Sequence, residues 1–199
     1  INTGSPHYVK IMDNISDLNI KKRGSEMIVA ANWKMNLELS SASALASDYC
    51  ATSHEVVTRI LFAPHPYLVP IGARLRNSGI LLGGQDCHQS PSGAHTGDVS
   101  TGMLRDCGAS LVLLGHSERR VDHGETSELV AAKAVQAFKT GLSVMICVGE
   151  TVADREAGNA LATVLDQLAI SVPATLPTTA LTIAYEPVWA IGTGKVATA

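Results

Sequence analysis

The sequence predicts an α/β fold made of repeated strand–helix units around a parallel sheet. Six short apolar runs recur along the chain at intervals of roughly thirty residues, with stretches of helical periodicity between them. Hydrophobicity within each run is continuous rather than alternating, which indicates strands buried on both faces. Units of this kind connect by right-handed crossovers, so a doubly wound sheet and a (β/α)₈ barrel both fit.

The predicted strands are the apolar runs themselves. Most of them lead into a polar, proline-containing or glycine-containing segment, as expected where a strand passes into a loop. In chain order they are Met27–Ala31, Arg59–Ala63, Ile80–Gly84, Ser110–Gly115, Leu142–Gly149 and Leu181–Tyr185.

Helices are predicted between the strands. An Ala-rich stretch from Ser40 to Glu55 gives the first. A second lies between Glu125 and Gly141, and its apolar face consists of Val130, Ala134, Ala137 and Phe138. A third opens at a capping box formed by Thr151 and Asp154 and continues through Ile170.

Composition and charge argue against several kinds of partner. The chain has 199 residues, 46% of them apolar and 17% charged, which is ordinary for one globular domain. The formal net charge is −3 and the longest basic run is Lys21–Arg23, so we expect neither nucleic acid nor a polybasic membrane anchor. The apolar runs fall well short of the roughly 18 residues that span a bilayer. The N-terminus has no signal-peptide pattern, so we expect no membrane partner and a cytoplasmic location.

The cysteines are predicted to be free, mostly buried thiols. They are Cys50, Cys87, Cys107 and Cys147, and no Cys-x-x-Cys pair occurs among them. Cys87 and His88 are adjacent and His95 lies nearby, but structural zinc sites use two such closely spaced pairs, so we expect no metal. No Gly-x-Gly-x-x-Gly follows the first strand, which argues against a dinucleotide cofactor.

Polar and titratable side chains gather just after the predicted strands. Taken singly, each is ordinarily a solvated strand end or a satisfied histidine. Together they lie at the carboxyl ends of parallel strands, where both architectures build their sites. These residues are Asn32, Lys34, Gln85, Asp86, His116 and Glu186.

Four motifs resemble the signatures of the triosephosphate isomerase family, in that family's order and spacing. They are NWKMN (Asn32–Asn36), GHSERR (Gly115–Arg120), CVGE (Cys147–Glu150) and AYEPVWAIGTGK (Ala184–Lys195). The resemblance runs from about Met27 to the final residue. It implies an α/β fold of the (β/α)₈ TIM-barrel type, truncated after strand 6. Residues 27–199 would form this incomplete barrel domain, and residues 1–26 an extension outside it.

The resemblance also implies an activity, the interconversion of dihydroxyacetone phosphate and glyceraldehyde 3-phosphate through an enediolate, without cofactor or metal. Such a reaction needs a base beside a carbonyl, a group that polarises the carbonyl, and a cation near the developing charge. By the family motifs Glu186 is the base, His116 the neutral electrophile and Lys34 the cation. Apolar residues around Glu186 would desolvate it and so make it a stronger base.

Further residues are assigned to substrate binding by the same resemblance. Asn32 would donate its amide to a substrate oxygen, and Lys34 would also bind the phosphate. The segment Pro187–Lys195 resembles a lid that closes over the substrate and excludes water. Within that lid, Gly192 would place a backbone N–H on the phosphate.

The segment SPSGAHTGDVS (Ser90–Ser100) resembles the loop that dimers of this family insert into the neighbouring subunit. It implies a homodimer in which Thr96 approaches the partner's catalytic lysine. The family usually has an aromatic residue where His95 stands. An ordinary Gly/Ser-rich surface loop is the alternative interpretation.

The chain stops at Ala199, so we expect strands seven and eight, with the remaining phosphate contacts, to be missing. Six strands would leave the first and sixth unpaired along their outer edges. The alternative to an active isomerase is therefore an inactive fragment that only associates or needs a C-terminal piece in trans. A different phosphosugar barrel enzyme is a third hypothesis, because one fold hosts many chemistries.

The first residues resemble a different family. NTGSPH (Asn2–His7) is similar to a substrate-contacting motif of diaminopimelate epimerases. The similarity is confined to about the first 26 residues, which contain none of the cysteines that this family uses as acid and base. Ordinary Gly/Ser/Pro turn composition is the alternative explanation, and we expect no epimerase activity.

Overall fold

The computed structural model describes residues 8–10, 27–51 and 57–190. Its centre is a curved sheet in which six parallel strands pair in chain order. The strands are β2 (Met27–Asn32), β3 (Val57–Ala63), β4 (Ile80–Gly84), β5 (Leu111–Leu114), β6 (Ser143–Val148) and β7 (Leu181–Tyr185). All six predicted strands are therefore confirmed.

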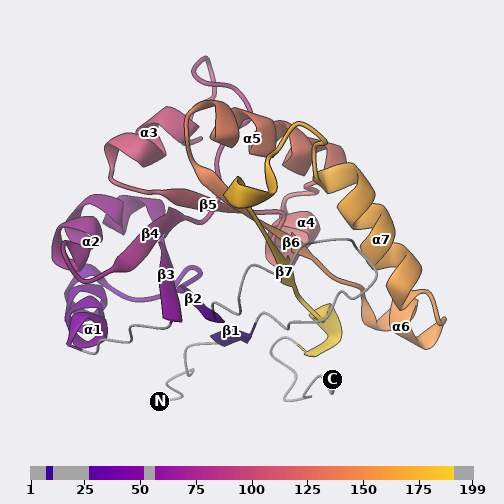
Figure 1. The fold of residues 1–199 in the computed structure, drawn as a ribbon, viewed down its shortest axis with the longest axis horizontal. Helices are drawn as coiled ribbons and strands as arrows, with labels where there is room; N and C mark the ends of the chain where they lie inside the picture. The colour runs from indigo at the N-terminus through magenta and orange to yellow at the C-terminus, as the bar shows by residue number, and fades with distance from the viewer. Residues whose placement is uncertain (1–7, 11–26, 52–56, 191–199) are drawn as a thin grey trace.

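The longer helices lie along the outer, convex side of the sheet (Figure 1). The α-helices are α1 (Leu39–Cys50), α2 (Leu68–Leu75), α3 (Thr101–Asp106), α4 (Ser117–Asp122), α5 (Ser127–Lys139), α6 (Val152–Glu156) and α7 (Ala160–Ser171). Three 3₁₀ turns accompany them, η1 (His65–Tyr67), η2 (Thr178–Ala180) and η3 (Val188–Ala190). A doubly wound sheet would carry helices on both faces. The arrangement is instead a curled half-barrel of the TIM-barrel type.

Both faces of the sheet are buried, as the continuous apolar runs predict. Along β5, Leu111 and Leu113 belong to the cluster on one face, together with Phe62 and Met145. The alternate residues of β5, beginning with Val112, pack in the larger cluster that includes the helices. The inward cluster fills the concave side and so forms the floor beneath the carboxyl ends of the strands.

The prediction for α5 is right about the helix and partly wrong about its buried face. Val130, Ala134 and Ala137 are fully buried, but Phe138 is 39% exposed. Lys133 is instead buried, with 4% of its surface exposed. Phe138 lies at the margin of the apolar stripe, whereas Lys133 has acidic partners inside the protein that make its burial possible.

The third predicted helix is in fact two helices. The capping box is confirmed, since the Thr151 hydroxyl accepts the Asp154 N–H (3.2 Å) and the Asp154 carboxylate accepts the Thr151 N–H (3.0 Å). The expected continuous helix is wrong, because Gly158 adopts a left-handed φ of 76° after α6. Such a glycine ends a helix, and the chain restarts as α7.

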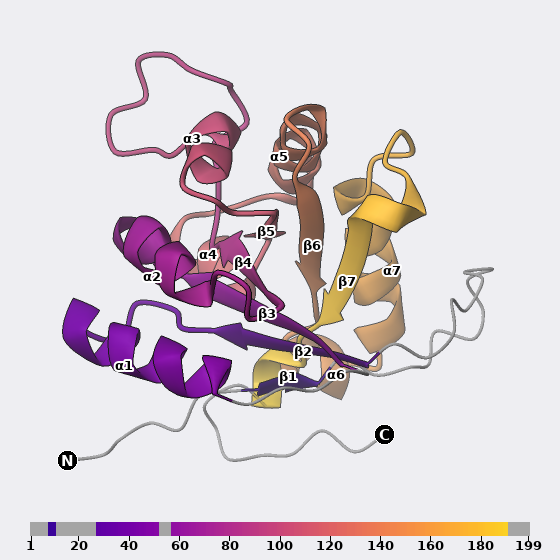
Figure 2. The same ribbon diagram turned by 60° about the vertical axis from the view of Figure 1, so that its left-hand side comes forward.

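The two outer edges of the sheet differ. Strand β1 (Tyr8–Lys10) pairs antiparallel with residues 29–31 of β2 and lies beside it in Figure 2. The expectation that the first barrel strand is unpaired on its outer side is therefore wrong, and three residues of the segment placed outside the barrel join the sheet. On the opposite side, β7 pairs only with β6 within the described residues.

Within the described part of the chain, no helix is long and apolar enough to cross a membrane. The cysteines that the structure describes are free, with Cys87 and Cys147 buried and Cys50 and Cys107 half-buried. The epimerase-like hexamer at residues 2–7 lies outside the described residues.

Candidate active site

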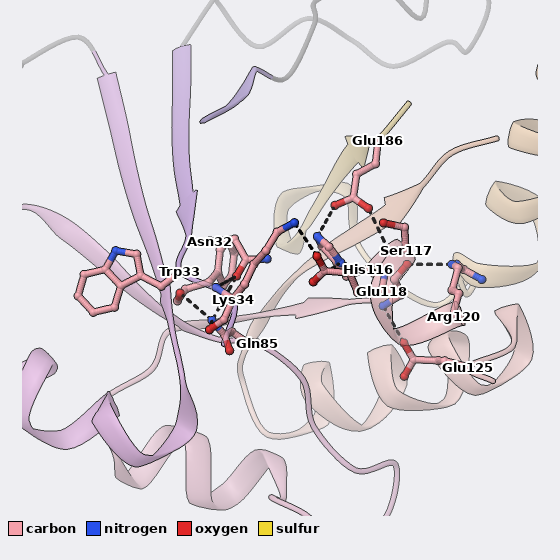
Figure 3. A network of polar contacts seen from close by, with 12 residues as sticks. Asn32, Trp33, Lys34, Gln85, His116, Ser117, Glu118, Arg120, Glu125 and Glu186 are labelled. Atoms are coloured by element: carbon pink, nitrogen blue, oxygen red, sulfur yellow. Dashed lines mark hydrogen bonds and ion pairs between the residues drawn. The ribbon is translucent and has the colours of Figure 1, made fainter. Parts of the chain in front are cut away.

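The polar residues predicted from the strand ends converge in space. Figure 3 shows Asn32 at the end of β2, Lys34 just beyond it, Gln85 after β4, His116 after β5 and Glu186 after β7 around one region. They come from strands far apart in the sequence, and the parallel sheet places all of those strand ends on one side.

The segment after β2 is held in a fixed conformation. Lys34 has a left-handed φ of 52°, which costs a non-glycine residue about 1–2 kcal/mol. Its N–H donates to Asn32 Oδ1 (2.9 Å), and Gln85 Nε2 donates both to Asn32 Oδ1 (3.2 Å) and to the Lys34 carbonyl (3.0 Å). These bonds orient the Lys34 side chain across the site, where Nζ pairs with Glu118 Oε1 at 2.6 Å.

His116 is oriented by the start of α4. It is the N-cap residue, and its Nδ1 accepts the Glu118 N–H (3.2 Å), so in the neutral ring the proton is on Nε2. That Nε2 lies 3.1 Å from Glu186 Oε1, and Glu186 Oε2 accepts the Ser117 N–H (3.1 Å). The predicted base and electrophile are thus in direct contact, and α4 begins directly after His116.

Glu186 is buried, with 5% of its surface exposed, as expected for a desolvated base. Its N–H donates to the Val148 carbonyl (2.8 Å), which continues the β6–β7 pairing by one residue. A Cβ atom on Gly149 would overlap the Glu186 carbonyl oxygen, so only glycine permits this approach. The thiol of Cys147 lies nearby, and burial, followed by the adjacent Glu186 carboxylate, raises its pKa so that it stays neutral.

A buried ionic network fixes the turn before His116, and sequence reasoning missed most of it. Glu125 Oε2 accepts the Gly115 N–H (3.1 Å), and Glu125 also pairs with Lys133. Lys133 Nζ lies 2.8 Å from Asp86, which also pairs with Arg119 at 2.9 Å. Burial raises the pKa of Asp86 despite these cations. The four charged residues of this network lie at positions 86, 119, 125 and 133, and this spacing matches no local sequence pattern that would have predicted it.

Arg120 makes a second connection from the same turn. Its Nε donates to the Gly115 carbonyl (2.8 Å), and a terminal nitrogen donates to the Cys147 carbonyl (3.3 Å) and to Ser171 (3.2 Å). Burial lowers the pKa of this guanidinium. Arg120 thereby joins the ends of β5 and β6 to the end of α7.

The start of the predicted lid is anchored on Glu150, the last residue of the CVGE motif. Glu150 is fully buried and accepts hydrogen bonds from Tyr185 Oη (2.9 Å) and Trp189 Nε1 (2.8 Å). Arg155 pairs with the same carboxylate at 3.2 Å and lies 4.5 Å from the centre of the Trp189 ring. Gly192, predicted to bind phosphate, lies outside the described residues, as does the rest of the lid after Ala190.

The segment predicted to contact a second subunit forms a protruding loop beside α3 (Figures 1 and 2). Thr96 is exposed on it. Among the described residues, one group of donor atoms lies close enough together to share a metal ion. It consists of His88, His95 and Asp98, in this loop and just before it, and is separate from Lys34, His116 and Glu186.

The fold and the site together define a barrel-type α/β protein with a contacting histidine–glutamate pair and a lysine at the carboxyl end of its sheet. The chain belongs to the triosephosphate isomerase family, whose model, described as "Triosephosphate isomerase", matches residues 27–199. This confirms the resemblance of the four motifs and sets aside an unrelated phosphosugar barrel enzyme.

Individual relatives agree with the family match. Triosephosphate isomerase of Hyphomonas neptunium is 46% identical over 174 residues, covering 86% of this chain and 70% of the relative. That of Dinoroseobacter shibae is 48% identical over 172 residues, covering 85% and 68%. The crystal structure of triosephosphate isomerase from Bartonella henselae superimposes with a TM-score of 0.77 at 37% identity, covering 83% of this chain and 69% of that one.

Proposed function

We propose that this chain interconverts dihydroxyacetone phosphate and glyceraldehyde 3-phosphate. The observation that supports this most is the direct contact of Glu186 with the Nε2 of His116, in a site that Lys34 also enters. A buried carboxylate, a neutral imidazole donor and a lysine are the three groups that proton transfer beside a carbonyl requires.

In the proposed reaction, the Glu186 carboxylate takes a proton from the carbon beside the substrate carbonyl. The electron pair of that C–H bond moves into a C=C bond, and the carbonyl oxygen gains negative charge. The His116 Nε2–H polarises this oxygen and can donate its proton to it. The proton that Glu186 took from the substrate then adds to the former carbonyl carbon. The second hydroxyl becomes the new carbonyl as its O–H proton passes to His116 Nε2, which restores the imidazole.

Substrate must replace contacts that the site now makes with itself. Glu186 has to give up its bonds to His116 and Ser117 before it can reach a substrate carbon. Lys34 pairs with Glu118 in the structure, and the anionic substrate phosphate would compete for it. Helix α4 would then keep His116 in the same orientation throughout, because the Glu118 N–H bond to Nδ1 does not involve substrate.

Three further parts of the proposal rest on the family resemblance. Asn32 and Gly192 would add hydrogen bonds to the substrate, and no cofactor would be needed. The loop that carries Thr96 would join two copies of the chain into a homodimer. The protein would act in the cytoplasm, with no nucleic-acid or membrane partner.

The test is a coupled assay of glyceraldehyde 3-phosphate isomerisation, comparing the purified chain with Glu186→Gln. A carboxamide cannot accept the proton, so we expect the rate to fall by about 10²- to 10⁴-fold. His123→Gln, an exposed histidine away from the site, is the matched control and should leave the rate unchanged. Equal rates for the parent and Glu186→Gln would show that this glutamate is not the base.

A second candidate follows from the free edge of β7. The chain spans 68–70% of the length of the relatives quoted above, and β7 has no outer partner among the described strands. The chain would then be inactive alone and would isomerise triose phosphates only with a segment covering the relatives' remaining residues. Activity that appears on adding this segment, and disappears with Glu186→Gln, would favour this candidate over the first.

A further inference from the structure

Gly149, the residue between the end of β6 and Glu150, is held by a side chain that lies outside the predicted site. Gln167 belongs to α7. Its Oε1 accepts the Gly149 N–H (2.9 Å), and its Nε2 donates to the Gly149 carbonyl (3.0 Å). One side-chain amide therefore bonds both main-chain groups of a single residue, as the opposite residue of a neighbouring strand would do.

The place of Gln167 on α7 shows that these bonds matter to the fold. Val164 and Leu168 pack against the core on the helix side of the sheet, and Gln167 is half-buried on the same face of the helix. An amide in such a position costs free energy unless its hydrogen bonds are made. The main chain of Gly149 supplies a donor and an acceptor, and so satisfies the side chain completely.

Gly149 in turn contacts the main chain of Glu186. A Cβ atom on Gly149 would come within 1.7 Å of the Glu186 carbonyl oxygen, so the two main chains touch where a side chain would otherwise stand. The Glu186 N–H also donates to the carbonyl of Val148, the residue before Gly149 (2.8 Å). Gln167 is therefore connected to Glu186 through one intervening residue.

This connection gains importance when substrate replaces the resting contacts of the carboxylate. Glu186 must give up its bonds to His116 and Ser117 before it can reach a substrate carbon. Its main chain can keep both the bond to Val148 and the contact with Gly149. The conformation of residues 148 and 149 then decides where the carboxylate lies.

We propose that Gln167 is a positioning residue for Glu186, and that its paired bonds to Gly149 set the point from which the carboxylate reaches the substrate. The inference rests on the proposed function, in which Glu186 is the base. Gln167 bonds to Gly149 and to no reacting group, so its loss should slow proton transfer without weakening substrate binding. The expected result is a lower kcat with a KM close to that of the parent.

The first test uses the Ser117 amide as a reporter, because its N–H donates to Glu186 Oε2 (3.1 Å). Gln167→Met removes both bonds to Gly149 and keeps the length of the side chain. We expect the ¹⁵N–¹H resonance of Ser117 to move away from its position in the parent. Leu168→Ala is the control, since it removes apolar packing from the same face of α7 but leaves the Gln167 amide in place. Its Ser117 resonance should stay at the parent position.

Gln167→Glu provides a rescue experiment, and a milder variant should Gln167→Met fold poorly. The introduced carboxylate accepts the Gly149 N–H but cannot donate to the Gly149 carbonyl, whereas the protonated carboxyl group can do both. The Ser117 resonance of Gln167→Glu should therefore approach that of the parent, recorded at the same pH, as acidification protonates the new side chain. Gln167→Met should remain displaced at every pH.

A coupled isomerase assay gives the second measurement, with circular dichroism to confirm that each variant is folded. Gln167→Met should lower kcat by about 10-fold or more and leave KM near the parent value, because misplacing a catalytic group by about 1 Å can cost about 10²-fold. Leu168→Ala should keep the parent kcat.

Four results would overturn the inference. They are an unmoved Ser117 resonance in Gln167→Met, an equal displacement in Leu168→Ala, a Gln167→Glu resonance that stays displaced on acidification, and an unchanged kcat of Gln167→Met beside an active parent. A parent chain that fails to isomerise triose phosphates would count against the proposed function instead. The Ser117 resonance would then decide by itself whether Gln167 positions the Glu186 carboxylate.

Discussion

The two residues in contact at the centre of the site come from very different parts of the sheet. His116 follows β5, whose residues are all buried and which pairs with a strand on each side. Glu186 follows β7, which pairs only with β6 in the described part of the chain and is mostly half-buried. The proposed electrophile is therefore held by a strand with a neighbour on each side, whereas the proposed base follows a strand with one described neighbour.

The supporting contacts show the same contrast. Both the N–H and the carbonyl of Gly115, next to His116, are bonded, to Glu125 and Arg120 respectively. Glu186 is positioned by one backbone bond to β6 and by two bonds to the His116 segment itself. If Glu186 is the base, as proposed, it must move between these resting contacts and a substrate carbon, and its fewer supporting bonds would allow this.

The largest effect should come from breaking the buried network on the His116 side. In Lys133→Met, Asp86 and Glu125 lose a buried cation, which we expect to lower the free energy of unfolding by about 3–5 kcal/mol. Urea denaturation measures this. Lys139→Met, at the exposed end of the same helix, should stay within about 0.5 kcal/mol of the parent. Similar losses for both would mean that the network does not hold the electrophile.

The next largest effect concerns the base. Gly149→Ala forces apart the ends of β6 and β7, because the new methyl group overlaps the Glu186 carbonyl. A displacement of about 1 Å can cost about 10²-fold in rate, so kcat should fall by that order in a chain that isomerises triose phosphates. The matched change Gly102→Ala lies in α3, where the nearest atom to a new Cβ is 3.7 Å away. An unchanged kcat in Gly149→Ala would mean that β7 shifts without moving the carboxylate.

A smaller effect is expected where the edge strand is anchored to Glu150. Tyr185→Phe removes one donor to this buried carboxylate and should lower the free energy of unfolding by about 1.5–3 kcal/mol, the usual range for a hydrogen bond to a charged group. The loss should appear in thermal or urea unfolding. Tyr67→Phe, which removes a bond to the Leu37 carbonyl on the other side of the molecule, serves as control. A larger loss of unfolding free energy in Tyr67→Phe than in Tyr185→Phe would contradict the claim that the bond to Glu150 anchors the edge strand.

The smallest effect is a pH dependence on the His116 side. Burial lowers the pKa of His65, whose Nε2 lies 3.0 Å from the Asp86 carbonyl. The unfolded chain binds a proton here near the ordinary value of 6.5 and the folded chain resists it, so stability falls as the pH drops below that value. Urea midpoints of the parent and His65→Gln, compared above and below it, measure this contribution. A parallel pH dependence in both proteins would assign it to other groups.

The parts of this structure that the sequence predicts are those encoded over short distances. Each strand is one continuous apolar run, and each site residue lies at the end of its strand or within two residues of it, so parallel pairing brings Asn32, His116 and Glu186 together. The capping box of Thr151 and the helix start after His116 are local signals as well.

The parts that were missed depend on partners distant in the sequence. From the sequence, Lys133 is expected to be a solvated residue of α5. Its burial depends on Asp86, which is 47 positions earlier and lies beside it only in the folded chain. Gln85 was noted at its strand end, but its bonds to Asn32 and Lys34 appear only when β2 and β4 are side by side. Likewise, no sequence pattern in residues 8–10 predicts a strand, because these three residues form β1 by pairing with β2.

That pairing also affects how copies of the chain could aggregate. A head-to-tail polymer of sheets would need β7 of one copy to add to the outer edge of β2 in the next, and β1 already covers part of that edge. A strand added at this end would have to pair with the outer side of β1, which is three residues long, or with the part of β2 that β1 leaves uncovered. A three-residue strand thus shortens the stretch of β2 that is open to a strand from another copy of the chain.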